Sequence, residues 1–334
     1  MSILFSICIP TYNRAKYLQE NIDLLLKEIS KKRFNEVELC VSDNASTDNT
    51  EEVVRKYIQS YPQIKITYKK NEKNLGGDWN FHHAMNMATG EYSLLLGDDD
   101  LLVENAIERI TGLIENNDVF DVLLFNRIIV GVNTGVIKTE SWLRDDIETK
   151  TFDFSVPIEE KYYYTLCRSL GGAFSFISAI VYKTEAVTNI EFDESYIGTA
   201  YSFLHYILTY LKSGKKLLFF KDALIKCRIG LPSWGFGYKR IFLDYRGYLF
   251  IKSKLFANNS GIEFINVLKY EWPINKLLEA FCNMSSDDWN EFKPLLQQAG
   301  WSVNDITFIE QIGNSPNWFQ SKFKQKLKKT LKRQ

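Results

Sequence analysis

Three consecutive aspartates, Asp98, Asp99 and Asp100, are the residues of this sequence best suited to chemistry, and they follow the apolar run 94–96 and Gly97. Like charges held together are costly unless a cation offsets them. Hard divalent ions such as Mg²⁺ and Mn²⁺ prefer carboxylate oxygens and commonly keep positions for the phosphates of a substrate. The cluster therefore predicts a divalent metal site that faces a phosphate-containing substrate. The alternative is a solvated loop or helix start, where aspartate is also favoured.

A second polar group contains Asp43, which follows the apolar run 37–41, and Tyr12, which follows the run 4–9. A carboxylate can accept hydrogen bonds from the amino or imide edge of a base, and an aromatic ring offers the base a flat face. These two residues therefore predict a nucleotide site. It is equally open that Asp43 and Ser46 only shape the turn into the next helix.

The elements that must position these residues can be predicted from hydrophobic periodicity. We predict strands at residues 4–9, 37–41, 64–69 and 92–96, and helices at 17–29, 48–61 and 78–88. The spacing of Asp48 and Glu51 is typical of a capping box at the start of the second helix. This βαβα series predicts a parallel, doubly wound sheet, in which ligands collect at the carboxyl ends of the strands. We therefore expect the polar clusters to meet at one edge.

Beyond Asp100 the pattern is less regular. We expect a helix at 103–115, a strand at 122–126, weak regularity over 127–164 and a mostly helical region from residue 239 onward. The chain is thus an α/β protein with a helical C-terminal extension.

Composition excludes several classes of protein. The chain has 334 residues, of which 45% are apolar, and its 41 basic and 41 acidic side chains cancel. This balance predicts a large globular core and argues against a protein that coats nucleic acid. The five cysteines are widely spaced and include no C-x-x-C pair, which favours a reducing compartment. No run of residues is long and apolar enough for a membrane span or a signal segment, so we expect a cytoplasmic protein.

The charges are nevertheless unevenly distributed. Residues 321–334 contain seven basic side chains and no acidic one, which leaves a net charge of −7 on the remainder. Apolar residues recur there at every fourth position: Phe319, Phe323, Leu327 and Leu331. Wound as a helix, the 318–334 tail predicts peripheral binding to an anionic membrane surface. The alternative is a solvated helix docked on the body; nucleic acid is a poorer partner because the acidic remainder repels phosphates.

Four segments, in their order and spacing, resemble the serial motifs of glycosyltransferase family 2. They are SICIPTYNR, VSDNASTDNT, NLGGDWNFHHAMNMATGEY and LLLGDDD. The resemblance covers residues 1–130 well and 192–228 weakly. It implies the GT-A fold, which is a Rossmann-like, mostly parallel, doubly wound α/β sheet. It also implies a nucleotide-sugar half at 1–100 and an acceptor half at 101–235, followed by the helical region 236–334.

In that family the first two motifs hold the nucleotide of a sugar donor. The resemblance therefore implies donor-binding roles for Pro10, Thr11, Tyr12 and Asp43. Asn74 opens a stretch that resembles the family loop beneath the donor, where glycines permit close approach of the backbone.

The aspartate motif of the family touches the ribose and the metal bound to the diphosphate. This implies that Asp98 binds ribose and that Asp99 or Asp100 binds Mn²⁺ or Mg²⁺. The choice between those two stays open, because the commoner pattern begins with aspartate where Gly97 stands. Arg228 lies in a segment that resembles the one closing over the donor, and its planar fork suits a diphosphate; the alternative is an ordinary surface ion pair.

Family members use a carboxylate on a later helix to deprotonate the acceptor hydroxyl. Here the corresponding stretch, residues 198–205, contains no acid. Asp193 and Glu194 lie slightly upstream and are candidates, with an exposed turn as the alternative. His205 is a candidate by its chemistry and would share a helical face with Tyr201, with a buried, hydrogen-bonded histidine as the alternative.

The resemblance implies a metal-dependent glycosyltransferase that moves a sugar from a nucleoside diphosphate to a glycan hydroxyl, with inversion. The acceptor would be a lipid-linked glycan of bacterial surface polysaccharide, reached at the inner face of the cell membrane. A sugar nucleotidyltransferase is an alternative, although it would need a Gly-rich, basic first loop where residues 10–14 read PTYNR. A catalytically silent glycan-binding or scaffold protein is another, which the missing base keeps open.

Overall fold

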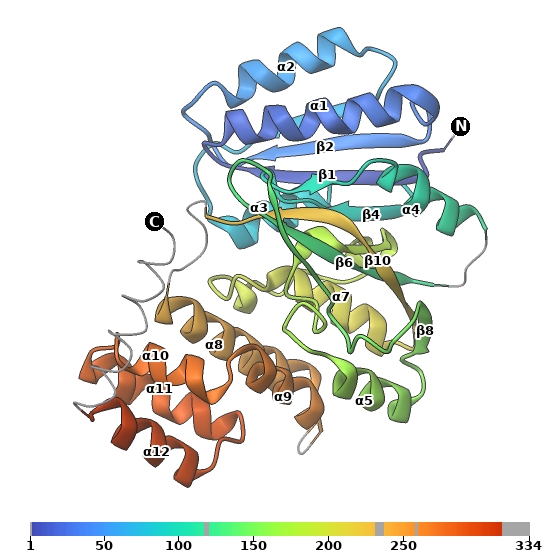
Figure 1. Ribbon diagram of the computed structural model, residues 1–334. Coiled ribbons are helices and arrows are strands. Elements are labelled where there is room, and N and C mark those ends of the chain that lie inside the picture. The colour runs from blue at the N-terminus through green and yellow to red at the C-terminus, as the bar shows by residue number, and fades with distance from the viewer. Residues whose placement is uncertain (1, 117–119, 231–236, 258–259, 316–334) are drawn as a thin grey trace. The chain divides into compact units, whose positions relative to one another are not determined.

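The computed structural model describes residues 2–116, 120–230, 237–257 and 260–315 (Figure 1). The chain divides into two compact units, Met1–Pro232 and Ser233–Gln334. The described part of the first unit is α/β and that of the second is helical. Every predicted donor, metal and base residue lies in the first unit.

The first half of the sheet is parallel, in the order β3-β2-β1-β4. Its strands are β1 (Phe5–Thr11), β2 (Val37–Asp43), β3 (Ile66–Lys70) and β4 (Tyr92–Leu95). All residues of β1, β2 and β4 are buried, as expected for strands covered on both faces. Thr11 is in register with Asp43, so the two strands end together. The four predicted strands are confirmed.

The three predicted helices are also present: α1 (Ala15–Lys32), α2 (Thr50–Ser60) and α3 (Gly77–Met85). Right-handed crossovers place α1 and α2 on one face of the sheet and α3 on the other, because the chain reverses direction across the sheet after β3. Figure 1 shows this arrangement, with α7 (Ser202–Lys212) on the same side as α3.

The second half of the sheet is mixed, in the order β4-β9-β6-β10-β5. These strands are β5 (Leu101–Leu102), β6 (Val122–Val130), β9 (Ile180–Lys183) and β10 (Lys216–Arg228), with β7 (Val136–Glu140) and β8 (Lys150–Asp153) at the margins. Strands β6 and β10 run in the direction of β1, while β5, β7, β8 and β9 run against it. Six of the ten strands of the described sheet therefore run in one direction, as the predicted mostly parallel fold requires.

The expectation of weak regularity over residues 127–164 was wrong. Strand β6 continues to Val130 and forms a hairpin with β7, and β8 and α5 (Pro157–Leu166) follow. Most residues of β7 are exposed, because it lies at an edge of the sheet. An edge strand without a buried face has no apolar alternation, so the sequence carried no signal for it.

The remaining short elements of the first unit are α4 (Ala106–Glu115), α6 (Glu185–Thr188) and two 3-10 turns, η1 (Ile177–Ala179) and η2 (Glu194–Tyr196). The second unit contains α8 (Tyr238–Leu255), α9 (Ile262–Glu271), α10 (Ile274–Phe281), α11 (Ser286–Gln298) and α12 (Val303–Gly313). Capping boxes open α11 and α12. Among the described helices, none combines the length and apolarity that crossing a membrane requires. The 318–334 tail lies outside the described residues.

A buried carboxylate near the amino ends of the strands, Glu38, offers a first prediction. Its side chain accepts hydrogen bonds from Ser6 Oγ and from the backbone N–H of Thr89, both at 2.6 Å, and pairs with Lys65 at 2.7 Å. Burial alone would raise the pKa of Glu38, but these partners outweigh it and leave the pKa below its ordinary value. Glu38→Gln should lower the free energy of unfolding by about 1.5–3 kcal/mol at neutral pH.

The sign of the pH dependence follows from the lowered pKa. The carboxylate contributes its stability above the ordinary value of 4.5, and this contribution is lost as the pH falls through the folded-state pKa. Urea unfolding of the wild type and Glu38→Gln should therefore differ at neutral pH and converge in acid. A difference that persists unchanged in acid would contradict the ionic origin.

Candidate active site

The carboxyl ends of β1 and β4 meet through side chains, as predicted. Thr11, the last residue of β1, donates from Oγ1 to Asp98 Oδ2 at 2.8 Å. Arg14 Nη1 lies 3.1 Å from Asp98 Oδ1 and 2.7 Å from Asp99 Oδ2. The first motif therefore contacts the aspartate motif directly, although 84 to 87 residues separate them in the chain.

Asp100 turns away from this pair. Its Oδ2 accepts a hydrogen bond from Ser178 Oγ at 2.6 Å, and the same hydroxyl accepts one from the backbone N–H of Gly97 at 2.9 Å. A Cβ built on Gly97 would lie 2.9 Å from Asp100 Oδ2. The space that a first aspartate would occupy is thus taken by the carboxylate of Asp100, which accounts for glycine at this position.

The charges of the cluster are poorly compensated. Burial, together with the charge of Asp99, raises the pKa of Asp98 to about 6 against the opposing effect of Arg14. Burial and Asp99 likewise raise the pKa of Asp100 to about 7, although Ser178 and Arg127 lower it. Carboxyl groups that hold protons this strongly favour an additional cation nearby.

The carboxylate oxygens of the cluster suit Mn²⁺ or Mg²⁺. Within the described residues, no set of three or more His, Cys, Asp or Glu side chains is placed to hold a metal. The protein would thus supply few ligands, and substrate oxygens would complete the shell, as is common for Mg²⁺. Asp99 is more accessible than Asp98, with 19% of its side chain exposed against 7%.

The nucleotide candidates lie at the same edge. Pro10 is buried in β1 and pairs with Ser42, while Tyr12 is 42% exposed and presents its ring to solvent. Asp43 is fully buried; its Oδ1 accepts from the backbone N–H of Ser46 at 2.8 Å and its Oδ2 from Tyr68 at 2.6 Å. The turn-shaping role left open above is therefore present, and binding of a base by Asp43 stays a prediction.

Asn74 is held in a loop organised by the buried side chain of Asn44. Asn44 Nδ2 donates to Asn74 Oδ1 at 2.8 Å and to the Gly76 carbonyl at 3.1 Å. Its Oδ1 accepts from Asn71 Nδ2 and from the backbone N–H of Leu75, both at 3.0 Å. The loop predicted to lie beneath the donor is therefore fixed to the end of β2.

Arg228 ends β10 with a buried guanidinium. Its side chain is 2% exposed, and Nη2 lies 3.0 Å from Glu20 Oε1. The group also lies 5.2 Å from the ring centre of Tyr17. Among the described residues, Nε has no hydrogen-bond acceptor, and Nη2 contacts Glu20 as an ion pair without hydrogen-bond geometry. Arg228 thus forms an ion pair, as in the alternative stated above, but its own side chain is buried, and its role toward a diphosphate stays a prediction.

The three candidate bases have local contacts. Asp193 caps η2 by accepting from the backbone N–H of Ser195 at 2.9 Å, and Glu194 is exposed in the same turn. His205 Nε2 lies 3.2 Å from the Glu191 carbonyl. Their part in proton abstraction stays a prediction.

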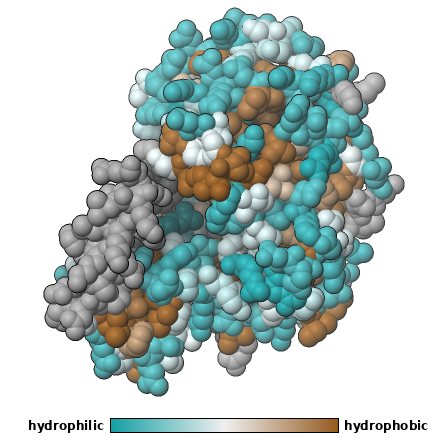
Figure 2. All heavy atoms as spheres, viewed as in Figure 1, coloured by the Kyte–Doolittle hydropathy of each residue, from teal (hydrophilic) through white to brown (hydrophobic). Residues whose placement is uncertain are grey.

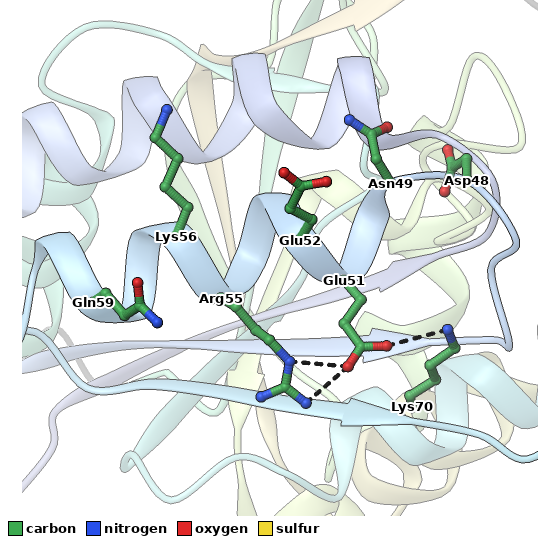
Figure 3. Close-up of a pocket in the computed structure, with 8 residues that line it drawn as sticks. All are labelled: Asp48, Asn49, Glu51, Glu52, Arg55, Lys56, Gln59 and Lys70. Atoms are coloured by element: carbon green, nitrogen blue, oxygen red, sulfur yellow. Dashed lines mark hydrogen bonds and ion pairs between the residues drawn. The ribbon is translucent and has the colours of Figure 1, made fainter.

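Two sequence arguments about helix starts were wrong. Tyr201 precedes α7 as its N-cap, so it does not share a helical face with His205. Asp48 and Glu51 do not form a capping box at α2. Asp48 instead accepts from Thr50 and from the backbone N–H of Ala15, and Glu51 binds Arg55 and Lys70 (Figure 3).

The pocket drawn in Figure 3 contains none of the predicted site residues. It is lined by Asp48, Asn49, Glu51, Glu52, Arg55, Lys56, Gln59 and Lys70. Glu51 already bridges Arg55 at 2.9 Å and Lys70 at 3.3 Å. The chemistry-bearing side chains lie instead at the ends of β1 and β4.

An apolar surface that the sequence did not reveal lies at the tip of the β6–β7 hairpin. Val132, Val136 and Ile137 are 48%, 68% and 58% exposed. Ile229, 44% exposed, hydrogen-bonds through its backbone to Val130 beside this tip. Figure 2 shows apolar side chains gathered on this face of the first unit. Ile229, which belongs to this surface, directly follows Arg228 in the chain.

Comparison with known proteins decides the family. The model of glycosyl transferase family 2 matches residues 6–173. The abequosyltransferase RfbV of Salmonella typhimurium is 32% identical over 321 residues, which cover 93% of this chain and 94% of that protein. The chain belongs to glycosyltransferase family 2. It is therefore a glycosyltransferase, and the predicted resemblance is confirmed.

Solved structures agree with the fold of this family 2 glycosyltransferase. S. aureus TarS 1-349 in complex with UDP superposes with a TM-score of 0.62 at 19% identity, covering 89% of this chain and 80% of that one. The mannosyltransferase PcManGT of Pyrobaculum calidifontis, in complex with GDP-Man and Mn²⁺, gives 0.54 at 15% identity over 96% and 83%. The GT-A fold prediction is confirmed.

Proposed function

We propose that this glycosyltransferase uses a nucleoside-diphosphate sugar as donor and a glycan hydroxyl as acceptor, with a divalent metal at the aspartates. The observation that carries the proposal is the meeting of Thr11 and Arg14 with Asp98 and Asp99 at the carboxyl ends of β1 and β4. Ligands of open α/β sheets bind at such an edge, where the strand order reverses.

The donor would lie along residues 1–100. The exposed ring of Tyr12 suits stacking on the base, with Pro10 and Asp43 beside it and Asn74 beneath. Asp98 would bind the ribose. The names of the structural neighbours, which contain UDP and GDP-Man, support this class of donor.

Asp99, with Asp100 as the other candidate, would hold Mn²⁺ or Mg²⁺ together with diphosphate oxygens. The bound ion would neutralise the charge that develops on the departing nucleotide. Arg228 would add hydrogen bonds to the diphosphate from its unused donors. Arg14, which now contacts Asp99 at 2.7 Å, would keep Asp98 oriented toward the donor.

The acceptor would enter from the 101–235 half. We propose inversion by single displacement, with Asp193, Glu194 or His205 taking the hydroxyl proton. A lipid-linked glycan of bacterial surface polysaccharide is supported by the named abequosyltransferase relative, by the apolar hairpin tip and by the basic 318–334 tail. The enzyme, with its helical region 236–334, would act peripherally at the cytoplasmic face of the membrane.

Calorimetry with a panel of UDP-, GDP-, CDP- and dTDP-sugars, abequose donors included, tests this proposal. We expect one donor to bind in Mn²⁺ and to bind at least about tenfold more weakly in EDTA, and to be hydrolysed slowly without acceptor. Binding without hydrolysis or transfer would indicate the silent scaffold. Formation of a nucleotide sugar from a triphosphate and a sugar phosphate would indicate the nucleotidyltransferase.

A further inference from the structure

Asp78, near the start of α3, makes three hydrogen bonds to one distant segment of the chain. Its Oδ2 accepts from the backbone N–H of Gly198 at 2.8 Å and of Ala200 at 3.2 Å. Its Oδ1 accepts from the N–H of Ser202 at 3.2 Å. The side chain is 3% exposed. One carboxylate thus satisfies three backbone amides, at alternate positions, of residues 198–202.

That segment needs external support. Gly198 and Ala200 have φ angles of +87° and +62°, and the left-handed conformation is unfavourable for alanine. Such backbone persists only where the surroundings hold it. Ser202 begins α7, and the N-cap residue Tyr201 provides no side-chain cap. Asp78 therefore places its negative charge at the positive end of α7 and caps it from another element.

The start of α3 is itself fixed to the edge that carries the site. Asn80 Nδ2 donates to the carbonyls of Thr11 and Ser42 at 3.3 and 3.2 Å. Ser42 Oγ in turn donates to Asn80 Oδ1 at 2.7 Å. Because Thr11 also binds Asp98, Asp78 holds residues 198–202 at the same edge as the aspartate cluster.

The residues that precede Asp78 in the chain form the predicted donor loop, which Asn44 holds through four hydrogen bonds. Residues 71–80 are therefore tied to β2 by Asn44 and to the start of α7 by Asp78. This short stretch connects the loop beneath the donor with the partly exposed segment 198–202 on the acceptor half.

We infer that Asp78 is a positioning residue that sets the acceptor-side wall of the active site, residues 198–202, against the donor loop. The inference rests on the proposed function. The helix start where the sequence lacks an acid receives this carboxylate from α3 instead. Because its oxygens are occupied by backbone N–H groups, Asp78 acts through the segment that it holds. A shift of that segment would displace the bound acceptor hydroxyl, and even a small displacement slows the transfer of the sugar.

The test compares the effect of a substitution on use of the acceptor with its effect on binding and hydrolysis of the donor. Asp78→Asn keeps the shape of the side chain but turns an NH₂ group toward backbone donors. With an octyl glycoside that the wild type glycosylates, we expect the acceptor KM to rise about tenfold or more, while donor affinity and donor hydrolysis by water stay within about twofold. Asn44→Ala should show the reverse pattern, with weaker donor binding.

Two further variants keep the inference falsifiable. Glu38→Gln makes the same exchange of a buried carboxylate for an amide, but near the amino ends of the strands. It should leave the acceptor KM and the donor affinity unchanged, even where it lowers stability as much as Asp78→Asn does. Gly198→Ala strains only the held segment. The φ angle of +87° is unfavourable for alanine, and the added Cβ would meet no other atom within 4 Å. This substitution should raise the acceptor KM without affecting the donor, even if Asp78→Asn folds poorly.

Equal losses of hydrolysis and transfer in Asp78→Asn and Gly198→Ala, or an unchanged acceptor KM in both, would overturn the inference. Failure of the proposed function looks different, because the wild type itself would then neither bind nor hydrolyse a nucleotide sugar. In that case the inference falls with the function on which it rests.

Discussion

Alanine at both Asp99 and Asp100 is expected to lower kcat by about a thousandfold or more. Loss of the metal would remove several kcal/mol of charge stabilisation from the departing diphosphate, and each 1.4 kcal/mol is about tenfold in rate. Metal-dependent turnover of the donor found in the panel measures the effect. Full activity in this double variant would refute the metal site and the function built on it.

The matched control is alanine at both Asp145 and Asp146, which are adjacent and exposed. This double substitution likewise removes two carboxylates. Of these, Asp146 pairs with the partly exposed Arg144. The control should retain turnover. A comparable loss in the control would mean that net charge, not the site, caused the effect.

The site variant should not lose activity through unfolding. The folded-state pKa of Asp100, about 7, lies above its ordinary value of 3.8, so ionisation of this group opposes folding increasingly as the pH rises between those values. In EDTA, the free energy of unfolding of the variant relative to the wild type should therefore increase from about pH 4 to about pH 7. Urea titrations at several pH values measure this trend.

Replacing Arg228 by methionine is expected to lower turnover by about a hundredfold and to weaken donor binding. A charge-assisted donor aimed at a developing negative charge is typically worth this much. The folded protein should keep its stability, because methionine fills similar volume and the Glu20 carboxylate that loses its partner is 43% exposed. Turnover should therefore fall while the thermal unfolding of the same preparation stays unchanged.

Glu20→Gln serves as the control for Arg228, because it weakens the ion pair at 3.0 Å but keeps the guanidinium. We expect it to retain donor binding. If Arg228→Met unfolds the protein while Glu20→Gln does not, the guanidinium is structural and its assignment to the diphosphate is wrong.

The sequence predicted the core of the site because strong periodicity determines strand order. Buried runs that alternate with amphipathic helices place Thr11 and Asp98 at neighbouring strand ends, and the structure joins them at 2.8 Å. The same reasoning placed Asp43 at this edge, whereas Asn74 was assigned through the resemblance to the family. Contacts that depend on local pattern and parallel topology could thus be predicted.

Residues that act across the fold gave no such signal. Arg14 follows a turn, where an arginine is usually solvated, yet it binds two aspartates. Ser178 and Asp78 contact partners 78 and 120 residues away, and their types are common in turns and helix starts. Such pairings depend on tertiary geometry, for which a single sequence carries no periodicity.

The contact of Thr11 with Asp98 has a consequence for folding. Since 87 residues separate the two, the loop between them must close before the site exists, and no short fragment of the chain carries it. Any opening that releases β4 from β1 dismantles the binding site along with the strand pair. Donor binding and cohesion of the parallel half-sheet are therefore thermodynamically linked, so that each occupied donor site also suppresses local opening of the strands that form it.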